Sequence, residues 1–362
     1  MVNKIRIVSV LNSPACAALV SDAVKGTRDI EIVGTAINLH AGLAAIRIGA
    51  PDIVLAQDGP GIVEFTERVT KQRREAGIII MTVDNDPVSI QRVVAALTVG
   101  AFDFITIIGK NESMHSLLLS KIRRCSIKQF SNRARRSDIE NIGLNGPHTM
   151  DASPETAKAL VPDKPRVSNG TQFDALLIGV STGGPEALMR LLPDFPASMP
   201  IPVIIVLHMP REFTGPMAAA LDRKSSIRVK ETEDGEEPLR GKAYLARGGV
   251  HSVVRRDAQG KIRLHAFDGP PENGCRPSVD ALFRTAAPVF GGRTLAVVLT
   301  GMGVDGTKGA ETVKHHGGYV LAQDEPSSVV WGMPGSIVRA GLANEIAPLD
   351  GIASRVCELV GV

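Results

Sequence analysis

The feature that most constrains this chain is a repeated alternation of short apolar runs with amphipathic stretches. In residues 1–126, each strand-like run is followed by a stretch with helical spacing. This repetition predicts an α/β domain with a five-stranded parallel sheet. The strands are expected at residues 5–10, 30–36, 53–55, 78–83 and 102–107, and the helices at 15–24, 39–48, 62–74, 88–99 and 114–125.

The pattern stops after residue 126 and returns at residue 173. Residues 127–172 contain a basic run and several prolines without apolar periodicity, which predicts a flexible linker. Residues 173–362 predict a second domain that is doubly wound and mostly parallel, with an antiparallel excursion within 227–265. Its strands are expected at 175–180, 203–207, 294–299 and 319–322, and its helices at 185–192, 214–221, 278–287, 306–315 and 327–340.

Composition excludes several classes of protein. The chain has 41 Lys and Arg against 38 Asp and Glu, a net charge of +3, which gives no support for a nucleic-acid partner. It lacks both an apolar run of membrane-spanning length and the pattern of a signal peptide, so we expect no membrane insertion and a cytoplasmic location. The four cysteines lie far apart, as expected for reduced, buried thiols.

A glycine-rich turn carries the sharpest chemical signal. The sequence Gly179-Val-Ser181-Thr-Gly183 matches G-x-S-x-G and lies between a strand-like run and a helix. A serine on such a tight turn is exposed as a nucleophile, next to the free N–H groups of a helix N-terminus. Two other interpretations are a plain strand–helix turn and a phosphate-binding loop.

Two further candidates also follow buried strands. His208 comes directly after the run 203–207, and Asp305 lies in the glycine-rich loop after 294–299. Taken alone, each could be structural: a hydrogen-bonded histidine, and an aspartate that caps a helix. Together with Ser181, however, they could converge on one crevice at the strand ends, which is the arrangement that nucleophilic hydrolysis by a serine needs. No motif for metal or nucleotide binding is present, so we expect neither a metal nor a cofactor.

The second half of the chain resembles the catalytic domain of the bacterial chemotaxis protein-glutamate methylesterases. The resemblance implies a Ser181–His208–Asp305 catalytic triad. It also suggests that Thr182, Gly183 and Met302 line the site and provide the oxyanion hole. The matching segments are 178–185, 208–210, 233–235, 268–271, 276–280, 299–306, 322–323 and 332–334.

This resemblance implies the reaction and its partners. The substrates would be glutamyl γ-methyl esters on the cytoplasmic helices of chemoreceptors, and some members of the family also deamidate glutamines. The alternative is a regulatory or binding module that keeps the fold without the activity. The presence of all three triad residues favours catalysis. A third interpretation, a nucleotide-binding protein, lacks the phosphate-loop lysine.

Three segments of the first domain, 30–36, 51–55 and 100–105, carry a second resemblance. Through them the domain resembles the flavodoxin-like receiver domain of response regulators. A working receiver needs an acidic pair, an acceptor aspartate, a Ser or Thr and a lysine. The corresponding positions here hold Leu11-Asn12, Gln57, Thr82 and Ile107, with Asp58 one residue beyond the acceptor position. Without the carboxylates that hold Mg²⁺, we expect no phosphorylation. The domain would instead act as a cover, a dimerisation surface, or a docking module for a sensory kinase or scaffold.

Overall fold

The structure is a computed structural model that describes residues 4–73, 75–107, 114–126 and 173–362. The chain divides into two compact units, residues 1–134 and 135–362. The linker predicted at 127–172 lies outside the described residues, and the predicted domain boundaries stay predictions. A helix suited to spanning a bilayer is not found in the part of the chain that the structure describes.

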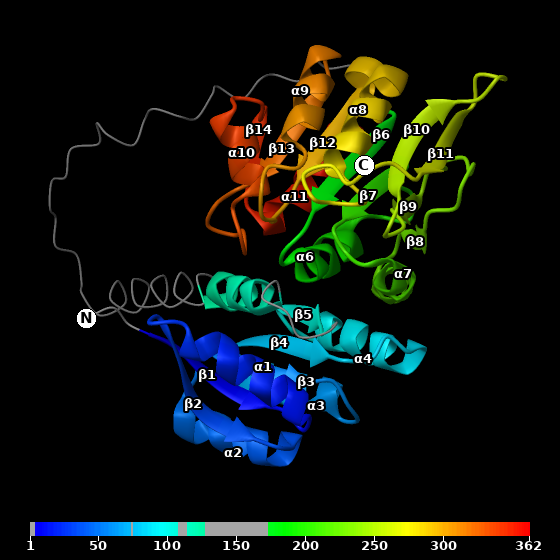
Figure 1. Cartoon of the computed structure of the whole chain (residues 1–362). Coiled ribbons are helices and arrows are strands. Elements are labelled where there is room, and N and C mark those ends of the chain that lie inside the picture. The colour runs from blue at the N-terminus through cyan, green and yellow to red at the C-terminus, as the bar shows by residue number, and fades with distance from the viewer. Residues whose placement is uncertain (1–3, 74, 108–113, 127–172) are drawn as a thin grey trace, which may run out of the picture. The chain divides into compact units, whose positions relative to one another are not determined.

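The first unit contains a five-stranded parallel sheet with strand order β2-β1-β3-β4-β5 (Figure 1). This is the flavodoxin-like order. Ser13, Asn38 and Asp86 cap helices α1, α2 and α4 through their side chains, as expected for these residue types. The elements are β1 (Ile5–Val10), α1 (Pro14–Lys25), β2 (Ile30–Ala36), α2 (Leu39–Gly49), β3 (Ile53–Gln57), α3 (Ile62–Gln72), β4 (Gly77–Thr82), α4 (Pro87–Thr98) and β5 (Asp103–Thr106), with residues 114–126 also helical.

The second unit is built on a seven-stranded sheet with strand order β14-β13-β12-β6-β7-β9-β8, in which every pair is parallel. A separate antiparallel pair, β10 and β11, stands beside helix α8. The strands are β6 (Ala175–Val180), β7 (Val203–Leu207), β8 (Arg228–Glu231), β9 (Lys242–Leu245), β10 (His251–Arg256), β11 (Ile262–Phe267), β12 (Thr294–Val298), β13 (Tyr319–Gln323) and β14 (Glu345–Ala347).

Helices cover both faces of this sheet (Figure 1). Helices α8, α9 and α10 pack on one face, where Phe283, Val313 and Ile337 join the buried core, and α6, α7 and α11 pack on the other. Burial of the sheet on both faces explains why its central strands are continuous apolar runs. The helices are α6 (Gly184–Leu191), α7 (Arg211–Lys224), α8 (Val279–Phe290), α9 (Thr307–His315), α10 (Met333–Arg339) and α11 (Leu349–Val360).

The predicted fold class is confirmed, with three differences in detail. Strands β8 and β9, within the predicted antiparallel excursion, instead extend the parallel sheet, and only β10 and β11 are antiparallel. The helix expected at 327–340 is reduced to α10. The residues before α10 form a loop, because the Val330 carbonyl accepts the Gly301 N–H at 2.9 Å. Strand β14 and helix α11 were not predicted.

Candidate functional site

Three loops meet at the carboxyl edge of the seven-stranded sheet. Strand β6 lies between β7 and β12 in the sheet. The strands that follow β6 in the chain before α8 (β7, β8 and β9) lie on one side of it, and those after α8 (β12, β13 and β14) lie on the other. Such a reversal of strand order opens a crevice at the carboxyl ends of the strands. The residues that follow these three strands include Ser181, His208 and Asp305. The fold therefore brings together loops that are distant in sequence.

Backbone hydrogen bonds fix the three loops to one another. The His208 N–H donates to the Val180 carbonyl at 3.1 Å, and Val180 pairs with Leu207, so Ser181 and His208 follow directly paired residues. The Ser181 N–H donates to the Thr300 carbonyl at 3.0 Å, which ties the serine turn to the loop after β12. The main chain thus sets Ser181 between the other two loops.

The serine turn needs its glycines because neighbouring side chains leave no space. A Cβ on Gly179 would lie 2.4 Å from a Val279 methyl group of α8. Gly183 has φ +77°, a conformation that other residues rarely adopt, and a Cβ there would lie 2.5 Å from Val329. The G-x-S-x-G pattern therefore meets a steric requirement of this turn, as the sequence analysis proposed.

The half-buried His208 is hydrogen-bonded to the buried Asp305. The Nε2 atom of His208 lies 2.9 Å from Oδ2 of Asp305, a residue that is 1% exposed. The Asp305 carboxylate also accepts four other hydrogen bonds, so it is fixed from several directions. Their donors are Asn273 Nδ2, Ser278 Oγ, Val279 N–H and Asp280 N–H, at 3.0, 2.7, 2.7 and 3.2 Å.

These contacts shift the pKa values of both groups. Burial acts to lower the pKa of His208, but the hydrogen bond with Asp305 and the adjacent Cys275 outweigh it and raise that pKa to about 9. Burial acts to raise the pKa of Asp305, but His208, Ser278 and the Val279 N–H hold that pKa well below its usual range. Asp305 therefore stays ionised and supports a positive charge on His208.

The second ring nitrogen of His208 faces a thiol. Cys275 Sγ lies 3.4 Å from Nδ1 of His208, on the side of the ring opposite Asp305. Because Asp305 occupies Nε2, Nδ1 is the ring nitrogen that Asp305 leaves free for another partner. Among the described residues, Ser181 Oγ has no hydrogen bond with His208. The structure thus pairs His208 with Asp305 and sets Ser181 on the adjoining strand end.

The residues predicted to line the site flank Ser181. Thr182 and Gly183 follow it in the turn, and the Thr182 carbonyl accepts a hydrogen bond from Thr300 Oγ1 at 3.0 Å. Met302 follows Gly301, at which a Cβ would lie 2.9 Å from the Ser181 Cβ. The Met302 residue is 50% exposed, so this side of the site is open to solvent.

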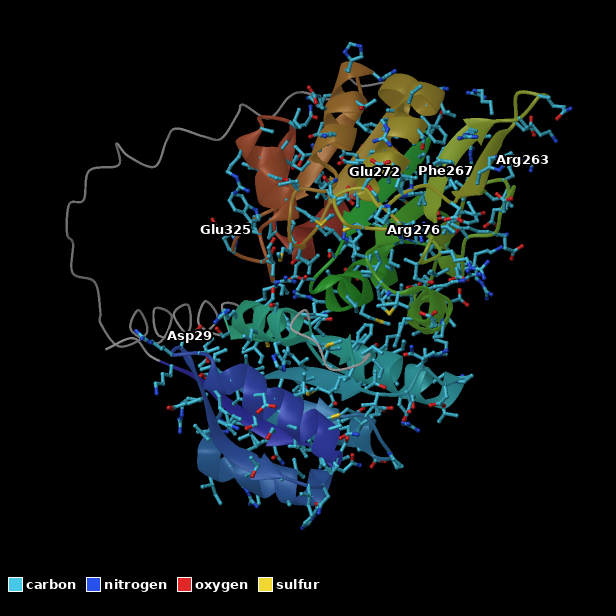
Figure 2. The ribbon with its side chains drawn as sticks, in the orientation of Figure 1. Asp29, Arg263, Phe267, Glu272, Arg276 and Glu325 are labelled. Atoms are coloured by element: carbon cyan, nitrogen blue, oxygen red, sulfur yellow. The ribbon has the colours of Figure 1, made fainter. Side chains whose placement is uncertain are left out.

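A tight turn before α8 supplies residues that the sequence analysis missed. Glu272 and Arg276, labelled in Figure 2, bracket this turn. All four cysteines are free. Cys16 and Cys125 are buried as expected, whereas Cys275, beside His208, and Cys357 are only half-buried. Ser278 and Asp280 lie in a segment recognised only as a family motif. Both residues donate hydrogen bonds to Asp305. The sequence alone does not show these contacts, because they form only in the folded chain.

Three side chains beside the serine turn carry atoms of the kinds that bind metals. Within the described part of the chain, His208, Cys275 and Asp305 form a cluster whose ligand atoms lie within 4.8 Å of one another. The Asp305 carboxylate already accepts several hydrogen bonds from this domain, including the one from Asn273. A metal bound to Asp305 would have to displace them, so these atoms fit a proton-transfer pair better than a metal site.

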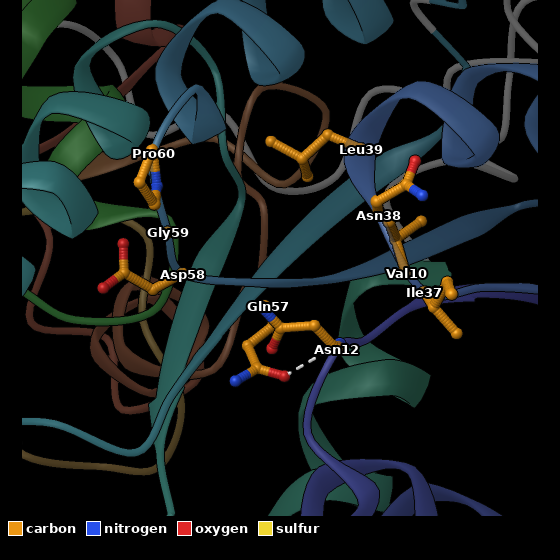
Figure 3. A pocket seen from close by; sticks show the side chains of 9 residues that line it. All are labelled: Val10, Asn12, Ile37, Asn38, Leu39, Gln57, Asp58, Gly59 and Pro60. Atoms are coloured by element: carbon orange, nitrogen blue, oxygen red, sulfur yellow. Dashed lines mark hydrogen bonds between the residues drawn. The ribbon is translucent and has the colours of Figure 1, made fainter.

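The carboxyl edge of the sheet in the first unit carries Asn12, Gln57 and Asp58 around a pocket (Figure 3). Gln57 Oε1, which the sequence analysis placed at the acceptor position, accepts the N–H groups of Asn12 and Ser13 at 3.2 and 2.9 Å. Asp58 instead forms a bidentate ion pair with Arg92, in which Nε and Nη2 of the guanidinium each lie 3.0 Å from a carboxylate oxygen. The Thr82 hydroxyl donates to the Asp84 carbonyl at 2.9 Å.

Comparisons with known proteins agree with this geometry. Residues 176–356 match the family described as CheB methylesterase. A protein of Desulfotalea psychrophila named protein-glutamate methylesterase/protein-glutamine glutaminase is 35% identical over 94% of each chain. A protein of Trichodesmium erythraeum with the same name is 35% identical over 99% of each chain.

A solved structure supports the same assignment for the second unit. The crystal structure of the Thermotoga maritima CheB methylesterase catalytic domain is 41% identical, with a TM-score of 0.51. It covers 52% of this chain, and all of that domain is matched. By the matched segment, the near-complete relatives and this structure, the chain belongs to the CheB methylesterase family.

Proposed function

We propose that this chain is a serine hydrolase that removes methyl groups from glutamyl γ-methyl esters on the cytoplasmic helices of chemoreceptors, and that it also deamidates receptor glutamines. The proposal rests on the His208–Asp305 hydrogen bond, which lies beside the turn that holds Ser181 between Gly179 and Gly183. Its membership of a family whose relatives are named for both reactions supports the choice of substrate. Such substrates imply a cytoplasmic location.

The first half of the reaction would acylate Ser181. Its Oγ attacks the ester carbonyl while Nδ1 of His208 accepts the hydroxyl proton. The imidazolium formed is stabilised by Asp305, which stays ionised. Backbone N–H groups near Thr182 and Met302 are the proposed donors to the developing oxyanion.

The remaining steps would complete the acylation and then hydrolyse the acyl-enzyme, which releases the two products in turn. The tetrahedral intermediate collapses as His208 gives its proton to the leaving methoxide, which departs as methanol. His208 then accepts a proton from water, whose oxygen attacks the acyl carbonyl. Loss of Ser181 Oγ, reprotonated by His208, yields the free glutamate. With a glutamine substrate, the same steps release ammonia and again leave glutamate.

The Cys275 side chain would have to move away from Nδ1 of His208 during this reaction. Its sulfur lies 3.4 Å from the nitrogen that Ser181 needs. Hydrogen bonds at catalytic sites often tighten only when substrate is bound. We therefore propose that bound substrate brings Ser181 Oγ onto Nδ1 in place of the thiol.

For the first domain, we propose a docking or covering role that does not depend on phosphorylation. The Asp58 carboxylate is paired with Arg92, and Gln57 occupies the acceptor position. Asn12 and Leu11 stand where a receiver has its Mg²⁺-binding acids. A sensory kinase or a scaffold is the proposed partner of this domain.

Removal of the nucleophile tests the hydrolase assignment. We expect Ser181→Ala to lower methanol release from methyl-labelled receptor membranes by about 10⁴-fold or more, because only oxyanion stabilisation and binding remain. Ser354→Ala, at an exposed position of α11, serves as the matched control and should retain full activity. Full activity of Ser181→Ala would refute the assignment, and inactivity of the wild type would favour the regulatory alternative.

The pH dependence tests the role of His208. We expect kcat/KM to rise with pH and level off above about 9, because only the neutral imidazole can accept the Ser181 proton. Asp305→Asn removes a group that raises this pKa, so the rise should move to lower pH while the plateau falls. Initial rates of methanol release, corrected for spontaneous hydrolysis, measure both effects. An Asp305→Asn profile with an unmoved rise would contradict this role.

The first domain can be tested separately with a phosphodonor. On incubation with acetyl phosphate and Mg²⁺, we expect no stoichiometric phosphorylation of the intact chain, because the metal-binding acids are missing. Intact-mass and peptide mass spectrometry measure the modification, with Asp58→Asn as the control. Stoichiometric, Mg²⁺-dependent phosphate on Asp58 in the wild type would show that the one-residue shift preserves an acceptor.

A further inference from the structure

The turn formed by residues 272–275, which we call the Asn-Gly turn, contacts both members of the His208–Asp305 pair. Glu272 and Cys275 exchange backbone hydrogen bonds of 3.1 and 2.8 Å across it. Its two central residues, Asn273 and Gly274, have φ +52° and +74°. Asparagine followed by glycine is the residue pair that favours such a two-residue turn. The backbone thus fixes where the Asn273 side chain points.

The Asn273 amide bridges two buried carboxylates. Its Nδ2 donates to Asp280 Oδ2 at 2.8 Å and to Asp305 Oδ1 at 3.0 Å. The Asp280 and Asp305 residues are 2% and 1% exposed. An amide group has two N–H bonds, so one Asn side chain can satisfy both acceptors.

The two bridged carboxylates repel each other. Burial raises the pKa of Asp280, and the negative charge of nearby Asp305 raises it further. The Gly309 N–H also donates to Asp280, at 2.7 Å, which keeps this second carboxylate in place. Charged groups near the pair include His208, and Arg284, which is itself bonded to Glu272 of the Asn-Gly turn. Two like charges this close need a shared donor between them.

We propose that Asn273 is a positioning residue that keeps the Asp305 carboxylate aimed at His208 by bridging it to Asp280. Without the bridge, the Asp305 carboxylate would keep its donors Ser278 Oγ and the Val279 and Asp280 N–H groups, but uncompensated repulsion from Asp280 would weaken its hydrogen bond with His208 Nε2. Asn273 itself touches neither Ser181 Oγ nor His208 in any hydrogen bond found among the described residues. The effect on catalysis therefore rests on the proposed hydrolase function, whereas the effect on the His208–Asp305 hydrogen bond does not.

The variant Asn273→Gly tests this role with the turn preserved. Glycine adopts positive φ readily, so the backbone of the turn is kept while the amide is removed. We expect kcat to fall on the order of ten- to a hundredfold, with KM little changed, because the lost hydrogen bonds are to charged groups that do not bind substrate. Glu272→Gln alters the same turn without touching Asp280 or Asp305, and should change kcat far less.

The far-downfield proton NMR signal of His208 Nε2–H, assigned by its loss in His208→Gln, gives a readout that needs no substrate. We expect this signal in the wild type and its loss in Asn273→Gly. The double variant Asn273→Gly/Asp280→Asn should recover the signal and part of kcat, since the repelling charge is gone. A thermal denaturation curve establishes that each variant is folded.

Each outcome decides the proposal. A retained signal and unchanged kcat in Asn273→Gly would overturn it. Loss of both without recovery in the double variant would also overturn it, because general damage to the turn is then the cause. If Ser181→Ala kept full activity, the proposed hydrolase function would fail, while the NMR signal would still report on Asn273.

Discussion

The hydrogen bond between His208 Nε2 and the buried Asp305 carboxylate is the interaction on which the site depends. A buried carboxylate is costly unless it is well supplied with donors, and Asp305 receives them from α8 and from the turn before it. The N-terminus of α8 therefore positions the Asp305 carboxylate as well as packing on the sheet. Because Asp305 occupies Nε2, Nδ1 is the ring nitrogen that the proposed mechanism assigns to Ser181.

The sheet provides the geometry in which this hydrogen bond can form. Parallel strands end at one edge, and β6 is central, so the loops after β6, β7 and β12 meet there. Glycines at 179 and 183 allow α8 and the loop before α10 to pack closely on the serine turn. At the strand ends of the first unit, the Asp58 carboxylate is instead paired with Arg92, and Gln57 accepts backbone N–H groups of the loop after β1.

Much of this could be predicted from sequence because it depends on local pattern. Strands β1, β2, β6 and β7 have the bounds that their apolar runs predicted, and Ser181, His208 and Asp305 follow strands that end at one edge of the sheet, as predicted. The roles of Cys275 and Asn273 were not predicted, because each depends on a contact with a residue distant in sequence. The parallel pairing of β8 and β9 was missed because short strands carry no signal for their direction.

Labelling of Ser181 by an alkyl fluorophosphonate tests the central claim most directly, because the probe requires an activated serine and no receptor. The account predicts that peptide mass spectrometry finds the label on Ser181 in the wild type. It also predicts that labelling is nearly lost in His208→Gln and strongly slowed in Asp305→Asn, since both act through the same proton transfer. Labelling at equal rates in all three proteins, or labelling of another residue, would contradict the account.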